Sequence, residues 1–278
     1  MFIRLLRLIF VNLLMVLSLG FAGMAKAQEN SDLSEDTHFR EELGINQYTT
    51  PSMGELFDTL DSFEPIPVQE LTRPPRAFRL DNRVRFALDF GILIGDGFLA
   101  VIGGDAKAIV PLGRELLRHA KGLGVEQPVS RHSKHLFDLA KQSNWNGLRK
   151  ELILIQEDVE TAMLELRDEE MAHLLSLGGW IRGLEIGAAS VATDFSPERA
   201  FKLRRLDLLD YYLQRLETFS PSLKSTPLIS KITSDLNGVR QKFVADQPLS
   251  RADVSAIRNT AHNLVMLIEE DAATAAAQ

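Results

Sequence analysis

The chain has 278 residues, a formal net charge of −7 and no cysteine. The lack of cysteine excludes disulfides, thiolate metal sites and the lipid-anchored cysteine of a bacterial lipoprotein. An acidic protein repels phosphate backbones, so the charge argues against nucleic acid as a partner. A chain of this length can bury a core large enough to fold without disulfides.

The first 27 residues have the three parts of a secretory signal. Two arginines form a basic head, an apolar run covers residues 8–21, and Ala-Lys-Ala at 25–27 is a small-x-small cleavage pattern. The apolar run is shorter than the roughly 20 residues that a membrane-spanning helix needs. Cleavage would start the mature chain at Gln28. Because the signal carries three basic residues and no acid, cleavage would change the net charge from −7 to −10. We therefore expect export to the bacterial periplasm.

Residues 28–79 are predicted to form a flexible acidic arm and a proline-rich linker with one short helix. Residues 28–50 are polar and acidic, with no sustained apolar period, as in a mobile arm. A short helix is predicted over residues 53–63. Four prolines within residues 64–77 predict an extended linker, because proline cannot continue a helix and also restricts the preceding residue.

Residues 80–272 are predicted to form an all-α, multi-helix bundle domain. Apolar residues recur every three or four positions, and the breaks coincide with glycine or proline. We expect about eight helices, at residues 80–102, 105–122, 129–142, 145–166, 168–192, 197–218, 222–243 (interrupted at Pro227) and 251–271. Residues 273–278 form a frayed tail. The order of helices is compatible with two pseudo-repeated four-helix halves.

The predicted helices 80–102 and 168–192 are apolar on almost every face, which is typical of a buried central helix or a membrane span. Each apolar run is short and carries two charges near its middle, so burial is favoured. A glycine inside a helix costs about 1 kcal/mol relative to alanine, yet these two helices contain Gly91, Gly95, Gly97, Gly178, Gly179, Gly183 and Gly187. We predict that the two helices cross at short range. The alternative is that the glycines make room for a ligand.

The same two helices carry the charged residues that would be buried. Asp89 and Asp96 share one helix face, and Arg182 and Glu185 are three residues apart and can pair. Because an unpaired buried charge costs several kcal/mol, these groups must pair, be neutral or reach water. One interpretation is a structural network in which Arg182 joins Asp96 or Glu185. The other is a ligand-binding pocket lined by Asp89, Asp96, Trp180, Arg182 and Glu185.

Two patterns were tested as metal sites. Glu170 and His173 match the Glu-x-x-His step of di-iron bundles, but such a site needs that step twice and the sequence has no second one. His132 and His135 are also three residues apart, but the apolar face of their helix is carried by Leu136, Leu139 and Ala140, so we expect both histidines to be solvated. The lack of a nearby carboxylate cluster argues against zinc. No nucleophile elbow or phosphate loop is present. The sequence thus predicts no catalytic residue, metal or cofactor, and favours a protein that is not an enzyme.

The leading hypothesis is an exported, soluble helical-bundle protein of the bacterial periplasm that binds another envelope protein or contributes to envelope organisation, without catalysing a reaction. The alternative is a bundle that binds a small molecule or metal in a polar pocket between the two glycine-rich helices. In either case we expect no nucleic-acid partner, and no stable membrane span after signal cleavage.

Overall fold

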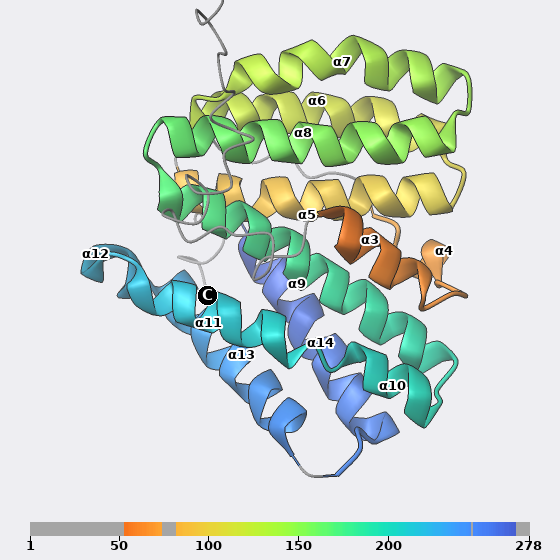
Figure 1. Cartoon of the computed structure of the whole chain (residues 1–278), viewed down its shortest axis with the longest axis vertical. Helices are drawn as coiled ribbons and strands as arrows, with labels where there is room; N and C mark the ends of the chain where they lie inside the picture. The colour runs from red at the N-terminus through yellow and green to blue at the C-terminus, as the bar shows by residue number, and fades with distance from the viewer. Residues whose placement is uncertain (1–52, 74–81, 246, 271–278) are drawn as a thin grey trace, which may run out of the picture. The chain divides into compact units, whose positions relative to one another are not determined.

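The computed structural model describes residues 53–73, 82–245 and 247–270 (Figure 1). The predicted signal peptide, the acidic arm at 28–50 and the tail at 273–278 lie outside these residues. Every regular element in the described part is a helix, which confirms the prediction of an all-α, multi-helix bundle. Within that part, no helix is both long and apolar enough to cross a membrane.

The first four long helices are α5 (Arg83–Ile102), α6 (Ala106–Leu123), α7 (Glu126–Lys141) and α8 (Trp145–Glu165). Each packs on the next, and α8 also packs on α5. Their bounds agree with the predicted helices to within three residues. Side-chain oxygens of Asn82 and Asn144 cap the first turns of α5 and α8. Gly124 ends α6 in the left-handed conformation, with φ of 84°.

The helices that follow α8 are α9 (Glu169–Thr193), α10 (Pro197–Leu203), α11 (Leu206–Thr218), α12 (Pro221–Lys224), α13 (Pro227–Val244) and α14 (Arg251–Ile268). The predicted interruption at Pro227 is confirmed. The prediction of one helix over residues 197–218 is wrong, because the backbones of Arg204 and Arg205 leave the helical region. The guanidinium of Arg204 instead donates hydrogen bonds to the carbonyls of Phe243 and Ala245, near the end of α13.

Helices α5 and α9 share the most extensive interface between two elements, and they cross in Figure 1. In α5 every residue from Phe86 to Ala100 except Asp96 is buried, and in α9 the whole stretch from Met171 to Val191 is buried. A Cβ on Gly91 would lie 2.0 Å from the carbonyl oxygen of Leu175, and one on Gly178 only 1.9 Å from that of Leu88. Both distances are far below van der Waals contact. The predicted short-range crossing is therefore confirmed.

The other glycines of these helices face different neighbours. A Cβ on Gly95 would lie 2.7 Å from Cγ of Arg182, so this glycine makes room for the arginine stem. Gly97 faces leucines of α6 and α8, and Gly187 faces Phe63 and Leu203. The glycines of α9 thus allow close packing at more than one interface: Gly178 against α5, and Gly187 against Phe63 and Leu203.

The segment before α5 contains α3 (Met53–Asp61), which confirms the predicted short helix, and the single turn α4 (Val68–Leu71). The stretch predicted as an extended linker is packed against the bundle in its described part, up to Arg73. Leu71 is buried, and Ser190 of α9 donates a hydrogen bond to the carbonyl of Pro65.

Aromatic stacking also holds α3 in place. The rings of Phe57 and Phe98 of α5 stack, with centroids 3.9 Å apart. The guanidinium of Arg149, on α8, lies 4.9 Å from the centroid of the Phe98 ring and pairs with Asp58 and Asp61. The fold therefore packs α3, as well as the described part of the predicted linker, against the bundle.

Candidate functional site

Arg182 lies at the centre of the buried polar groups. Its side chain is 1% exposed. Its Nε donates to Asp96 across 2.8 Å, its Nη1 to Glu185 across 2.5 Å, and its Nη2 to the carbonyl of Leu71 across 2.7 Å. The structure thus brings together three of the five residues that the sequence singled out, and Arg182 joins both of its predicted partners.

The pairing extends in both directions from this centre. Arg73, just after α4, donates to Asp96 across 2.9 Å and also pairs with Glu269 at the end of α14. On the other side, Nδ1 of His262 lies 2.8 Å from Glu185. We call these six residues the ion chain: Glu269, Arg73, Asp96, Arg182, Glu185 and His262. It connects α4, α5, α9 and α14 through one continuous series of polar contacts.

The surroundings of the ion chain raise the pKa values of Arg73 and Glu269, which lie at one end of it. Burial works against the charged form of Arg73, but the nearby Asp96 and Glu269 outweigh it and raise the pKa of Arg73 above its ordinary value. Burial raises the pKa of Glu269 to about 7, although Arg73 acts in the opposite direction. Glu269 therefore ionises close to neutral pH.

Asp89 belongs to a separate buried pair. Its Oδ2 lies 2.7 Å from Nε2 of His119, whose side chain is fully buried on α6. Nδ1 of His119 lies 2.7 Å from the carbonyl oxygen of Glu115. Because a carbonyl can only accept, Nδ1 is protonated and donates this hydrogen bond. Burial raises the pKa of Asp89, and the contact with His119 partly offsets this. Asp89 and Asp96 thus lie on the same helix but contact different partners: His119 for Asp89, and Arg73 and Arg182 for Asp96.

Trp180 is not among the members of the ion chain. Its ring packs against Tyr212, with centroids 5.3 Å apart. It also lines a crevice of only about 30 Å³ together with Leu60 and Leu208. The pocket interpretation requires Trp180 to line one site together with Asp96 and Arg182. In the structure its ring lies against other residues instead.

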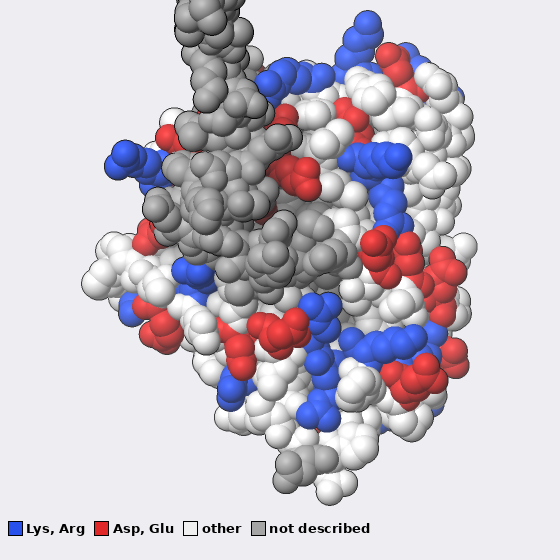
Figure 2. Space-filling view, viewed as in Figure 1, with Lys and Arg blue, Asp and Glu red and all other residues white. Residues whose placement is uncertain are grey.

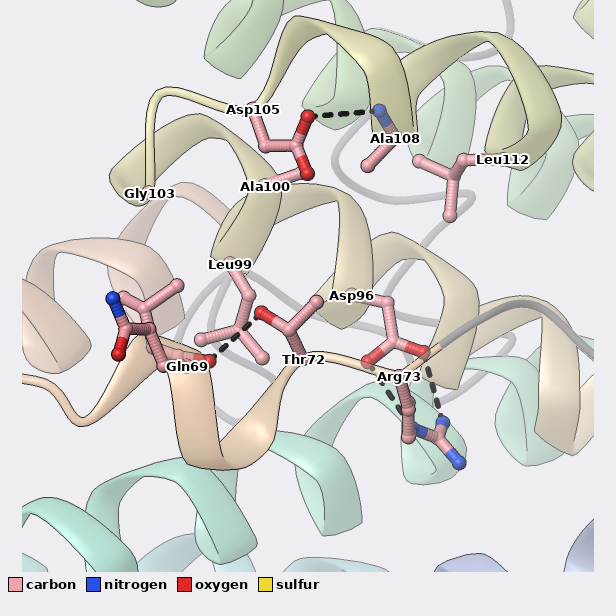
Figure 3. Close-up of a pocket in the computed structure, with 11 residues that line it drawn as sticks. Gln69, Thr72, Arg73, Asp96, Leu99, Ala100, Gly103, Asp105, Ala108 and Leu112 are labelled. Carbon is pink, nitrogen blue, oxygen red and sulfur yellow. Dashed lines mark hydrogen bonds and ion pairs between the residues drawn. The ribbon is translucent and has the colours of Figure 1, made fainter.

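A cavity of about 370 Å³ lies beside the ion chain, between α4, α5 and α6 (Figure 3). The Arg73–Asp96 pair lies in its wall. Asp105 is a second acidic side chain of the lining, and one of its oxygens caps α6 through the N–H groups of Lys107 and Ala108. The apolar lining consists of Val68, Leu99, Ala100, Ala108 and Leu112. The cavity lies beside the α5–α9 crossing, whereas the pocket interpretation of the sequence placed the binding site between these two helices.

The expectation that both histidines are solvated holds for His135, whose side chain is 63% exposed, but not for His132, whose side chain is only 16% exposed. Nδ1 of His132 lies 2.8 Å from Glu151, and Nδ1 of His135 lies 2.7 Å from the same carboxylate, whose side chain is buried on α8. Nε2 of His132 also contacts Asp158. These contacts join α7 to α8. Across the described ranges, no group of three or more such side chains has a geometry that could hold a metal ion.

Glu170 and His173 have unrelated partners. Glu170 accepts a hydrogen bond from the N–H of Ser220 across 2.6 Å, which ties α9 to the start of α12. His173 is buried next to the hydroxyl of Tyr211. Burial lowers the pKa of His173 to about 4, so the ring is neutral at pH 7.

Sequence reasoning missed His119, although a signal for it is present. His119 lies three residues after Leu116 and four before Leu123, on the apolar face of α6. A polar ring on an apolar face predicts a buried partner, which is Asp89. No comparable local signal marks Arg73 or Glu269, because each lies where a regular element ends.

Comparisons with family models, with curated proteins and with solved structures find no match for this chain. The site must therefore be interpreted from its own geometry. That geometry consists of a charged series that holds four elements together and a cavity that meets this series at the Arg73–Asp96 pair.

Proposed function

We propose that this chain is an exported, non-enzymatic binding protein of the bacterial periplasm. The basic head, apolar run and cleavage pattern of residues 1–27 support export. The cysteine-free composition is compatible with a protein that is stable in an oxidising compartment through its core alone.

The binding role rests on one observation, the 370 Å³ cavity beside the Arg73–Asp96 pair of the ion chain. Its volume lies within the range of sites that hold small molecules, which combine an apolar lining with a few fixed polar groups. Here Leu99 and Leu112 supply apolar surface, and the Arg73–Asp96 pair supplies a fixed polar wall. A small molecule with an apolar body and a polar end fits this lining.

Binding is favoured over catalysis because the members of the ion chain beside the cavity are engaged with one another. Asp96 accepts from both Arg73 and Arg182, and Arg182 is also held by Glu185 and a backbone carbonyl. Groups held in this way orient a ligand rather than transfer protons. Arg182 and Glu185 therefore act as positioning residues for the cavity wall.

Native mass spectrometry tests the cavity. The protein, purified from the periplasm without chelators, is expected to retain a bound small molecule. Ala108→Leu fills the cavity without touching an ion pair and is expected to lose the extra mass. Ala252→Leu, an equal change at an exposed position of α14, should keep it. A bare mass for the unmodified protein would count against a retained ligand, and equal retention by both variants would place that ligand elsewhere.

The export proposal has its own test. Expressed in a bacterial host, the chain should appear in the periplasmic fraction with the mass of a protein that begins at Gln28. Ala27→Asp removes a small residue from the cleavage pattern and should leave the full precursor mass. Recovery of the precursor from the cytoplasm, with or without the substitution, would contradict the proposal.

A second candidate function, binding of a partner protein, is favoured by a basic-rimmed groove between α6 and α7.

A further inference from the structure

The groove between α6 and α7 has a volume of about 570 Å³ and a mainly apolar floor. Val110 and Leu117 contribute from α6, and Phe137 and Ala140 from α7. A Cβ on Gly113 would lie 3.2 Å from the ring of Phe137. This glycine therefore lets the aromatic ring lie close to α6 and form part of the floor.

Three cations surround this floor: Lys107, Arg114 and Lys141. All three are exposed, and none takes part in an ion pair with another described residue. The lining contains no aspartate or glutamate. Over the face shown in Figure 2, by contrast, basic and acidic side chains intermingle. The groove is thus a local site of uncompensated positive charge on a protein whose net charge is −7.

The lining of the groove repeats along α6. Lys107 and Arg114 are seven residues apart, which corresponds to about 10.5 Å along a helix. The apolar residues Val110 and Leu117 have the same separation. A second helix lying along the groove could place apolar side chains against Val110 and Leu117 and acidic side chains, two turns apart, against Lys107 and Arg114. Helices that dock into grooves use such anchors.

We propose that the groove between α6 and α7 binds an acidic amphipathic helix of a partner protein. This inference rests on the binding role proposed above, but it uses a different face of α6 from the one that lines the cavity. Charge complementarity favours an acidic partner. The net negative charge of the chain opposes docking on an anionic membrane, which would also have to present its charge to a concave surface.

Fluorescence anisotropy with designed peptides tests the proposal on the full purified chain. The probe is an 18-residue labelled helix with leucines at i, i+3, i+4 and i+7 and glutamates beside them. A second probe has lysine in place of every glutamate. The acidic probe is expected to bind at least about ten-fold more tightly than the basic one, and to weaken as salt screens the rim.

Charge reversal provides the decisive comparison. Lys107→Glu/Arg114→Glu should weaken the acidic probe by at least about ten-fold and strengthen the basic probe. Lys134→Glu/Lys150→Glu makes the same charge change at exposed positions outside the groove lining and should change neither affinity by more than about two-fold. Circular dichroism confirms that both variants keep their helical content. Equal binding of the two probes, or the same effect in both variants, would overturn the proposal.

Other occupants give different results. A dimer that Lys107→Glu/Arg114→Glu dissociates would identify a second copy of the chain as the occupant. Binding to anionic vesicles without binding to the acidic probe would identify lipid. Either result overturns the partner-helix proposal. Ala108→Leu should leave probe binding unchanged, so loss of the cavity ligand and loss of peptide binding can be told apart.

Discussion

At the scale of single residues, the chain keeps several ionisable groups in its interior by pairing each with another. Arg182 is almost fully buried and contacts two carboxylates and a carbonyl. Such pairs contribute little net stability relative to a well-packed apolar core, but removal of one member leaves an uncompensated charge. The sequence identified Asp96, Arg182 and Glu185 because charges interrupt otherwise apolar helices.

Arg182→Met is expected to lower the free energy of unfolding by about 3–5 kcal/mol, because Glu185 then loses its buried counter-ion. Arg182→Met/Glu185→Met should recover part of this loss, since Asp96 keeps its contact with Arg73. Urea unfolding measures both effects. As a control, Arg131→Met removes an exposed ion pair and should cost less than about 1 kcal/mol. If the double variant were no more stable than the single one, the contacts of Arg182 would not be a structural network.

Glu269 predicts a pH dependence of stability. Its pKa of about 7 in the folded protein lies above the value of about 4.3 in an unfolded chain. The folded state therefore binds the extra proton between these values. This contribution to stability is fully present below about pH 4 and is lost as the pH rises through 7.

The measurement compares the natural chain with Glu269→Gln from pH 4.5 to 8. The stability of the natural chain relative to this variant should fall with rising pH, by up to about 3 kcal/mol. His173 has the opposite sign, but it is present in both proteins and cancels in the difference. A flat difference would show that the pKa of Glu269 is the same in the folded and unfolded chain, and a difference that increases with pH would show that folding lowers it; either result contradicts the prediction.

At the scale of helices, the central feature is the crossing of α5 and α9, where Gly91 and Gly178 let the two backbones touch. The sequence predicted this crossing because glycines inside helices need a compensating reason. It did not predict the break between α10 and α11, because that break depends on Arg204 reaching the distant end of α13. Local patterns thus located the helices better than their interruptions.

Gly178→Ala should destabilise the protein by several kcal/mol, because the new methyl group would lie 1.9 Å from the carbonyl oxygen of Leu88 and neither backbone can yield cheaply. Gly238→Ala in α13 provides the matched control. A Cβ there meets nothing within 4 Å, so the substitution should stabilise the helix by about 0.5–1 kcal/mol. Thermal unfolding monitored by circular dichroism measures both. Similar effects at the two positions would argue against the close crossing.

At the scale of the whole described part, residues of α5 to α8 and of α9 to α14 belong to one contiguous hydrophobic core. The α5–α9 interface joins the two sets of helices. The sequence left open whether two halves would pack as one core, because periodicity shows that a helix has an apolar face but not which helix covers it.

One core predicts one unfolding transition. Trp145 reports on α8 and Trp180 on α9, so the variants Trp145→Phe and Trp180→Phe each leave a single fluorescent probe. In each variant the fluorescence transition in urea should coincide with that variant's own loss of helical circular dichroism. A separate, earlier transition for either probe would mean that the two sets of helices unfold independently.

The sequence by itself determined the all-helical fold, the burial of two central helices and their glycine-mediated crossing. These features follow from apolar spacing and from the cost of glycine, which are local properties. Only the tertiary structure decided that Arg73, His262 and Glu269 join Arg182, and that Trp180 lies elsewhere. The partners of a buried charge come from helices distant in sequence, and the relative positions of those helices depend on how the whole core packs.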